Sequence, residues 1–359
     1  MKIRLYGALA GTILIAQACT ATQDLGENDP RNPKPDSGPG DATAGDGSTP
    51  PGDGGTPPAQ DAGFSLQAGL TFTQFPFDKS INTMWGASGS DIWAIGNEAF
   101  HYDGTKWSLF PTSSFHPGFG NPPPSLSEIW GTSSISAWGV GPIIIYRWNG
   151  SDWVSPPKLP GERLSLYTFS GVWAENDNNV WVSGSRYING TNDLEKSLFQ
   201  FKDDAWTTKY TQPDGYYYSI WGSDAQHLWI GGDNHILAYD GQNFVTVASG
   251  LSVRVQVIRG TSANDVWAFG TAGFISHWDG KAWKRFPIAA SIDFRAAFIR
   301  SANDIYAVGK LANTGSAIAH WDGASWTHGA AQDGAILHGV WGGPNEVWAL
   351  GDKIAYRGK

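Results

Sequence analysis

From residue 81 to the C-terminus, apolar and polar positions alternate in short segments that are separated by Gly, Asp and Asn. One pattern returns seven times: a large aromatic residue among small or aliphatic residues, closed by Gly, as in Asp-Ile-Trp-Ala-Ile-Gly at 91–96. Alternation with period two predicts β-strands, and a continuous helical period is absent. The central aromatic residues follow one another at intervals of 38 to 48 residues: Trp93, Trp138, Trp181, Trp229, Trp267, Tyr306 and Trp348.

Each repeat also carries strand and turn signals on either side of its central aromatic. A second large residue stands seven or eight positions earlier, as Trp85 does before Trp93, and an Asp-Gly or Asn-Gly pair follows in most repeats. The segment 102–107, Tyr-Asp-Gly-Thr-Lys-Trp, predicts a tight hairpin with positive φ at both central turn residues. Each repeat therefore predicts four short strands. The predicted fold class is all-β, a seven-bladed β-propeller of four-stranded antiparallel blades.

The two ends of the repeat region predict how the ring closes. The last repeat stops at Lys359, before a fourth strand, whereas residues 72–76 match the fourth strands at 107–111 and 283–287. A closed ring has to pair its last blade with the first segment of the chain. We therefore expect residues near 71–77 to complete the seventh blade.

Most of the large or charged residues within the repeat columns predict packing or turns. All 19 tryptophans fall into recurring columns, which indicates blade-to-blade contacts. Arg259 occupies the column of Trp85, so we expect it to pack there and to extend its charged end to water. The acids Asp91, Asp265 and Asp304 are expected to accept hydrogen bonds from nearby backbone amides.

The N-terminus has the charged, apolar and small-residue zones of an export signal. Lys2 and Arg4 precede the apolar stretch 5–16, and small residues lead to Cys19, the single cysteine of the chain. This junction resembles the lipobox of bacterial lipoproteins, which implies a signal peptide at 1–18 and lipidation of Cys19. Thr20 follows the cysteine, and the resemblance then implies sorting to the outer membrane or cell surface of a Gram-negative bacterium. An ordinary signal peptide cut after Ala18 is the alternative.

The segment that follows the signal has almost nothing to bury. Residues 19–65 are rich in Pro, Gly and Asp and predict a disordered tether, after which the propeller occupies 66–359. Eight acidic and two basic residues of the tether account for most of the formal net charge of −9. This acidity argues against a nucleic-acid partner.

The repeats resemble the Trp-rich propeller repeats of secreted bacterial lipoproteins, of the form Trp-Gly-x-Ser-x-x-Asp-Val-Trp-Ala-Val-Gly followed by His-Trp-Asp-Gly-x-x-Trp. Segments 275–283 and 318–326 carry the second part best. The resemblance covers residues 70–359 and implies the fold without implying an activity. The repeats are also distantly similar to the Asp-box of sialidase-like propellers and to kelch repeats, although here Asp and Gly are adjacent.

One polar column predicts where a ligand could bind. Three places before the first-strand aromatic stand Asn82, Ser127, Ser170, Tyr218, Gln256, Arg295 and His338, while the residues just before them are apolar. Such a ring suits a hydrated channel mouth, which is the simpler interpretation, or a ligand site. For a ligand site we single out six residues, with Arg295 as the anchor for an anion or carboxylate: Asn82, Glu128, Tyr218, Gln256, Arg295 and His338.

Two insertions, 111–125 and 185–197, have aromatic and charged residues such as Tyr187 and Arg186 that could wall this mouth. The eight histidines show no recurrent spacing, which predicts surface or channel positions and no metal site. Because no catalytic motif is apparent, we expect no catalytic residue and no cofactor.

The predicted function is a monomeric surface module that binds or scaffolds a protein or glycan. The alternative is a sialidase-like hydrolase or a lyase acting on carbohydrate at the channel mouth.

Overall fold

The computed structural model describes residues 64–65, 71–110, 125–156, 167–188, 191–312, 315–331 and 334–359. Within these ranges the regular structure consists of 25 β-strands and one 3-10 turn, η3 (Thr271–Gly273). The predicted signal peptide, Cys19 and the predicted tether up to residue 63 lie outside the described residues. The last two residues predicted as tether form strand β1 (Phe64–Ser65), which pairs with β2.

Three sheets have the predicted architecture of four antiparallel strands in chain order. Their strands are β6 (Glu128–Ser133), β7 (Ser136–Gly141), β8 (Ile144–Trp148) and β9 (Trp153–Val154); β10 (Tyr167–Asn176), β11 (Asn179–Tyr187), β12 (Leu194–Lys202) and β13 (Ala205–Pro213); and β20 (Ile292–Ser301), β21 (Asp304–Leu311), β22 (Gly315–Trp321) and β23 (Trp326–Ala330).

The other two sheets are larger because one long strand runs from each repeat into the next. β2 (Thr71–Ser88) pairs first with β25 and then with β3, and β16 (Phe244–Ser262) pairs first with β15 and then with β17. The remaining strands of these sheets are β24 (Leu337–Gly343), β25 (Glu346–Gly358), β3 (Asp91–Gly96), β4 (Ala99–Tyr102) and β5 (Trp107–Phe110); and β14 (Tyr217–Asp224), β15 (His227–Tyr239), β17 (Asp265–Gly270), β18 (Ile275–Trp278) and β19 (Trp283–Arg285).

Two long strands, β15 and β25, change partner at a residue with positive φ. β15 pairs with β14 up to Gly232 and with β16 from Asp233 on, and φ of Asn234 is +61°. β25 pairs with β24 up to Gly351 and with β2 from Asp352 on, and φ of Lys353 is +59°. Each of these strands therefore forms both the second and the third strand of its repeat.

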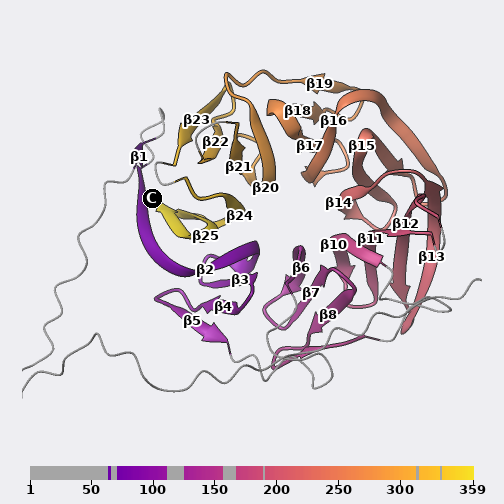
Figure 1. The fold of residues 1–359 in the computed structure, drawn as a ribbon, viewed down its shortest axis with the longest axis horizontal. Helices are drawn as coiled ribbons and strands as arrows, with labels where there is room; N and C mark the ends of the chain where they lie inside the picture. Colours follow the sequence, from indigo (N-terminus) through magenta and orange to yellow (C-terminus); the bar gives the residue numbers. More distant parts are fainter. Residues whose placement is uncertain are drawn as a thin grey trace, which may run out of the picture. The chain divides into compact units, whose positions relative to one another are not determined.

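The sheets stand around a central space with their first strands innermost (Figure 1). β6, β10, β14 and β20 border this space, whereas β5, β13 and β19 lie at the rim (Figure 1). This radial arrangement of small antiparallel sheets is that of a β-propeller.

The Asp-Gly hairpins are present but their turns are wider than predicted. Tyr102 pairs with Trp107, which leaves four residues in the loop, and positive φ occurs at Gly104 (+91°) but not at Asp103. The Asp103 carboxylate instead accepts hydrogen bonds from the backbone N–H groups of Thr105 and Lys106, at 2.8 and 3.0 Å. This Asx turn satisfies the loop amides, so a two-residue primed turn is not needed.

The core lies between the sheets and is built from the tryptophan columns. All 19 tryptophans are among the described residues, and each side chain is buried or half-buried. Trp93 packs against Trp148 and Trp153 of the next sheet, with ring centroids 4.8 and 5.9 Å apart. Trp348, near the C-terminus, packs in the same way against Trp107, at 5.6 Å. Aromatic contacts therefore continue from the last repeat to the first.

Candidate functional site

In six of the seven repeats, the polar position near the start of the inner strand lies in a β-bulge. Between β2 and β3, for example, the paired residues step from Ile81 to Thr83 and skip Asn82. A bulged residue is left out of the ladder, so its side chain can take a new direction. The equivalent register shifts skip Ser170, Tyr218, Gln256, Arg295 and His338.

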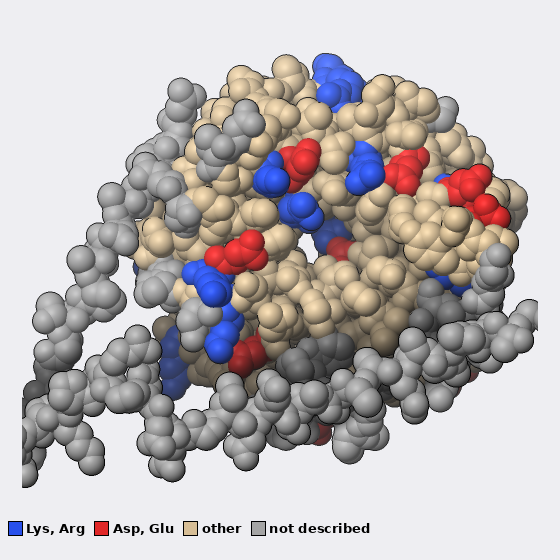
Figure 2. All heavy atoms as spheres, viewed as in Figure 1, with Lys and Arg blue, Asp and Glu red and all other residues tan. Residues whose placement is uncertain are grey.

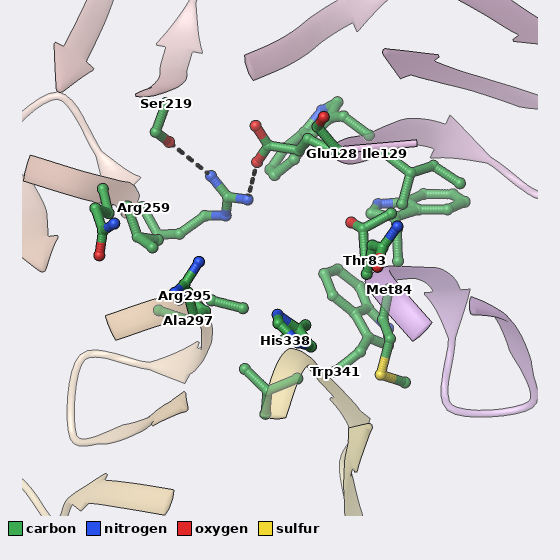
Figure 3. A pocket seen from close by; sticks show the side chains of 18 of the residues that line it. Thr83, Met84, Glu128, Ile129, Ser219, Arg259, Arg295, Ala297, His338 and Trp341 are labelled. Carbon is green, nitrogen blue, oxygen red and sulfur yellow. Dashed lines mark hydrogen bonds and ion pairs between the residues drawn. The ribbon is translucent and has the colours of Figure 1, made fainter. Parts of the chain in front are cut away.

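These polar side chains line one cavity at the centre of the propeller (Figure 3). Its wall includes all six residues singled out from the sequence: Asn82, Glu128, Tyr218, Gln256, Arg295 and His338. Ser127 and Ser170 complete the polar column. The cavity has a volume of about 110 Å³, enough for a few water molecules or one small chemical group.

Arg259 also lines the cavity, which corrects the expectation that it packs between blades with its charge in water. Its guanidinium group donates a hydrogen bond to the Glu128 carboxylate and lies 5.4 Å from the ring centroid of Trp130 (Figure 3). The two charged side chains are only 17% and 11% exposed. The guanidinium turns inward because a carboxylate buried without a partner would be strongly destabilising.

Glu128 connects several repeats around the cavity. One carboxylate oxygen accepts the hydrogen bond from Arg259 on β16, and the other accepts one from the backbone N–H of Val172 on β10, at 3.4 Å. Burial raises the pKa of Glu128 above its ordinary value, while the charge of Arg259 and both hydrogen bonds act to lower it. The carboxylate is therefore held by two neighbouring groups, the Arg259 guanidinium and the Val172 N–H, that favour its ionised form.

Arg295 and His338 lie next to each other on the cavity wall (Figure 3). Burial lowers the pKa of His338, and the positive charge of Arg295 lowers it further, against the opposing effect of Asp352. His338 Nε2 lies 3.3 Å from Asp352 Oδ1. Arg295 is exposed to the cavity and forms no ion pair with an acid among the described residues. Within the described part of the chain, its positive charge is therefore free to meet a ligand.

The Tyr218 hydroxyl donates a hydrogen bond to an acidic residue outside the cavity, whereas the side-chain oxygen of Gln256 accepts no hydrogen bond within the described residues. The Tyr218 hydroxyl donates to Asp233 Oδ1 at 2.8 Å, and burial followed by this bond raises the pKa of the phenol. Asp233 also lines a separate groove of about 710 Å³ together with Lys196 and Arg254. The buried Oε1 atom of Gln256 has no hydrogen-bond partner within the described part of the chain. Such an atom favours a bound water or ligand.

The face seen in Figure 2 has an opening at its centre, with acidic and basic side chains interspersed around it. Some charged side chains of the domain are paired: Lys79 Nζ lies 3.5 Å from Glu98 Oε2, and Arg254 Nε lies 3.5 Å from Asp233 Oδ1. A mixed surface of this kind carries no extended field of one sign.

One of the two predicted insertions can be placed. In the hairpin of β11 and β12, Arg186 Nε lies 3.0 Å from Glu195 Oε1, so its charge is neutralised locally. Tyr187 beside it is 61% exposed. The other predicted insertion covers residues 111–125. Only Ser125 of this insertion is among the described residues. The Ser125 hydroxyl accepts a hydrogen bond from the Asn82 amide.

Three histidines share one structural position, which the sequence spacing concealed. His101, His277 and His320 each pair across the sheet with the central aromatic residue of their repeat. Their Nε2 atoms lie 2.7, 2.6 and 2.8 Å from the turn acids, in that order Asp91, Asp265 and Asp304. The hydrogen bonds that these acids accept within the described part of the chain come from side chains, in place of the predicted backbone amides. The intervals differ because the hairpins between the second and third strands differ in length.

Among the residues that the structure describes, no group of three or more His, Cys, Asp or Glu side chains is placed to hold a metal ion. No helix there is long and apolar enough to cross a membrane.

Comparisons with known proteins identify the fold. No protein-family model and no curated protein sequence matches the chain. Virginiamycin B lyase of Staphylococcus aureus with quinupristin is similar, at 12% identity and a TM-score of 0.61, over 81% of this chain and 99% of that one. YCF48 bound to D1 peptide matches at 15% identity and a TM-score of 0.58, over 80% of this chain and 96% of that one.

The extracellular domain of a one-component system from B. thetaiotaomicron matches 82% of this chain at 9% identity and a TM-score of 0.56, with 45% of that chain covered. At identities this low, likeness to solved structures shows a shared fold and leaves the activity open. Together with the observed sheets, the comparisons establish this chain as a repeat protein with a β-propeller domain.

Proposed function

We propose that this protein is a binding module whose central cavity accepts one polar or charged group of a larger partner. The observation that carries the proposal is the convergence of seven polar side chains, one from each repeat, on a single cavity. Six of them sit at bulges, which are frequent beside functional sites. Arg295 adds a positive charge that no acid among the described residues neutralises.

The size of the cavity favours a large partner over a small ligand. Pockets that enclose whole small molecules usually measure about 300–1,000 Å³. A cavity of about 110 Å³ admits a side chain or a terminal group and leaves the rest of the ligand outside. A protein partner would make its remaining contacts on the surface outside the cavity. Tyr187, which is 61% exposed, is one aromatic side chain available for such contacts.

The similar structures suit a protein partner outside the cytoplasm. YCF48 was solved with a D1 peptide, and three of the similar chains are extracellular domains of sensor systems. We extend this to peptide or protein binding by the present chain, with a glycan partner as the alternative that the experiment below would reveal.

The chemistry of the cavity wall supports binding more than glycoside hydrolysis. Most glycosidases use two carboxyl groups flanking the scissile bond. Glu128 is the one carboxylate among the lining residues that the structure describes, and Arg259 already engages it. We therefore favour a binding function over a sialidase-like activity.

We infer that the ring has seven blades and is closed by the N-terminal part of β2. Seven pairings of a first with a second strand support the number, and the antiparallel pairing of β2 with β25, with Phe72 opposite Gly358, supports the closure. The contact of Trp348 with Trp107 points the same way.

We further propose that the propeller belongs with the Trp-rich lipoproteins that its repeats resemble. In this proposal the signal peptide ends at Ala18, lipidated Cys19 anchors the protein at the outer membrane or cell surface, and the tether carries a monomeric propeller. Incorporation of labelled palmitate that is lost in Cys19→Ala would support the anchor. Labelling that persists in Cys19→Ala would contradict it.

The binding function is tested by comparing Arg295→Ala and His338→Ala with the wild type. Envelope proteins are cross-linked to each form on the cell surface, and each purified form is applied to peptide and glycan arrays. Lys281→Ala, which removes a positive charge from an exposed turn, is the control. We expect both cavity variants to lose the interaction and the control to keep it. If both variants keep every detected interaction, the cavity is not the binding site.

A further inference from the structure

Arg259 interrupts an otherwise aromatic column of the inner strands. In the other six repeats this column is occupied by Trp85, Trp130, Trp173, Trp221, Phe298 and Trp341. Each aromatic residue in such a column can fill the space between adjacent blades. At Arg259 the side chain instead reaches across the cavity to Glu128.

The neighbouring repeat is adapted to this interruption. A β-carbon on Gly260 would lie 2.7 Å from the Trp221 ring, so the residue after the column aromatic has to be small where an aromatic packs on it. In the repeat after Arg259 this position is Ile299, which packs in the same apolar cluster as Val257. The isoleucine supplies apolar volume where the column lacks an aromatic ring. Arg259 is therefore free to line the cavity.

The result is a cavity with more positive than negative charge. Arg259 on β16 and Arg295 on β20 come from consecutive repeats and point into the same space (Figure 3). Glu128 is the one acid among the lining residues that the structure describes. It engages Arg259, while no acid among the described residues pairs with Arg295.

We propose, on the basis of the function above, that the group bound in this cavity is a carboxylate held by Arg295 and Arg259, and that Glu128 competes with it for Arg259. Guanidinium groups bind carboxylates through paired, charge-assisted hydrogen bonds. The cavity volume of about 110 Å³ suits an acidic side chain or a small organic acid. The ligand carboxylate thus takes the place that Glu128 holds in the unbound protein.

The experiment uses acetate as the probe and neutral acetamide as its control, at constant ionic strength, with the intact mature protein. Binding is followed through the NMR signals of the arginine Nε–H groups and of the His338 ring. We expect saturable shifts with acetate and none with acetamide. Capped aspartate and free succinate, added separately, distinguish an acidic side chain from a free organic acid by which of them binds more tightly.

Variants of the ion pair provide the decisive comparison. Arg295→Gln and Arg259→Gln should each weaken acetate binding about tenfold or more, because a charge-assisted hydrogen bond is lost. Glu128→Gln should strengthen binding about tenfold, because the competitor for Arg259 is removed. Arg254→Gln, which removes a charge from the separate groove, should leave it unchanged. An ion pair with a purely structural role would not give opposite effects for its two partners.

The proposal is overturned if wild-type protein shows no saturable shift with acetate, or if Glu128→Gln and Arg259→Gln change the affinity in the same direction. Circular dichroism and thermal unfolding check that each variant is folded. If either single variant is unstable, the double variant Glu128→Gln, Arg259→Gln removes both charges, and it should bind acetate more weakly than the wild type does, because one of the two guanidinium groups is lost. Loss of partner binding in Arg295→Ala without acetate binding would overturn this inference alone. Acetate binding without any effect of Arg295→Ala on partner binding would overturn the proposed function alone.

Discussion

The indole ring of Trp85 occupies the space that a side chain at Gly131 would need. A β-carbon on Gly131 would lie within 2.7 Å of three Trp85 ring atoms. Trp85 lies on β2 and Gly131 on β6, so this contact joins two sheets. The Trp-Gly pair of the repeat is therefore a packing device in which the tryptophan of one repeat covers the glycine of the next.

We expect Gly131→Ala to lower the free energy of unfolding by about 1–3 kcal/mol, because the added methyl group overpacks the contact with Trp85. Urea unfolding followed by tryptophan fluorescence measures the change. Trp85→Phe, which shortens the ring system, should partly relieve the effect of Gly131→Ala in the double variant. Strict additivity of the two substitutions would show that the contact is not responsible.

Phe72 should be important for the closure of the ring. Its side chain is fully buried and packs in one cluster with Ile354 and Tyr356. We expect Phe72→Ala to lower the free energy of unfolding by about 3–5 kcal/mol. Deleting residues 64–76 should expose the edge of β25 and cause aggregation. Deleting residues 20–56 is the control, and a soluble, equally stable 64–76 deletion would contradict closure by β2.

The pair of Asp265 and His277 predicts a loss of stability in acid. The hydrogen bond from His277 is the main cause that lowers the pKa of Asp265 below its ordinary value of 3.8. A carboxyl group with a lowered pKa in the folded state stabilises the fold above its unfolded pKa, and this contribution is lost as the pH falls through the folded pKa. Asp265→Asn should therefore lose less stability than the wild type between pH 5 and about pH 3. Asp193→Asn, at an exposed position, is the control and should behave like the wild type.

His338 should titrate below its ordinary pKa of 6.5, because it is buried and lies near Arg295. Arg295→Gln should raise the pKa of His338, and Asp352→Asn should lower it, because the two neighbours act in opposite directions. The C2 proton of His338 in an NMR titration measures both changes. A shift in the same direction for both variants would mean that charge is not the cause.

The lowered pKa of His338 also gives stability a definite pH dependence. The unfolded chain binds more protons than the folded protein between the folded pKa and 6.5, so the contribution is complete above 6.5 and is lost as the pH falls through this window. His338→Gln should remove this part of the slope in urea unfolding measured from pH 7.5 to 5. An unchanged slope in this variant would assign the effect to another group.

Much of the polar column could be predicted because aligning the repeats shows which residues differ from the others at the same position. Arg295 and His338 differ from Ser127 and Ser170 within one column, and the apolar residues before them indicated which side faces the core. The shared position of the three histidines in the sheet could not be predicted in this way. His101 and His320 stand at different distances from their acids along the chain, 10 and 16 residues, although they hold the same place in the sheet.

The sequence by itself determined the strands, the hairpins and the packing columns, because these depend on alternation, turn chemistry and spacing within one repeat. Only the tertiary structure decided that Arg259 turns into the cavity and meets Glu128. The two residues are 131 positions apart, and neither has a local neighbour that predicts the other. Their pairing follows from the placement of β6 and β16 around a common space, where a buried carboxylate is stable only with a charged or hydrogen-bonding partner.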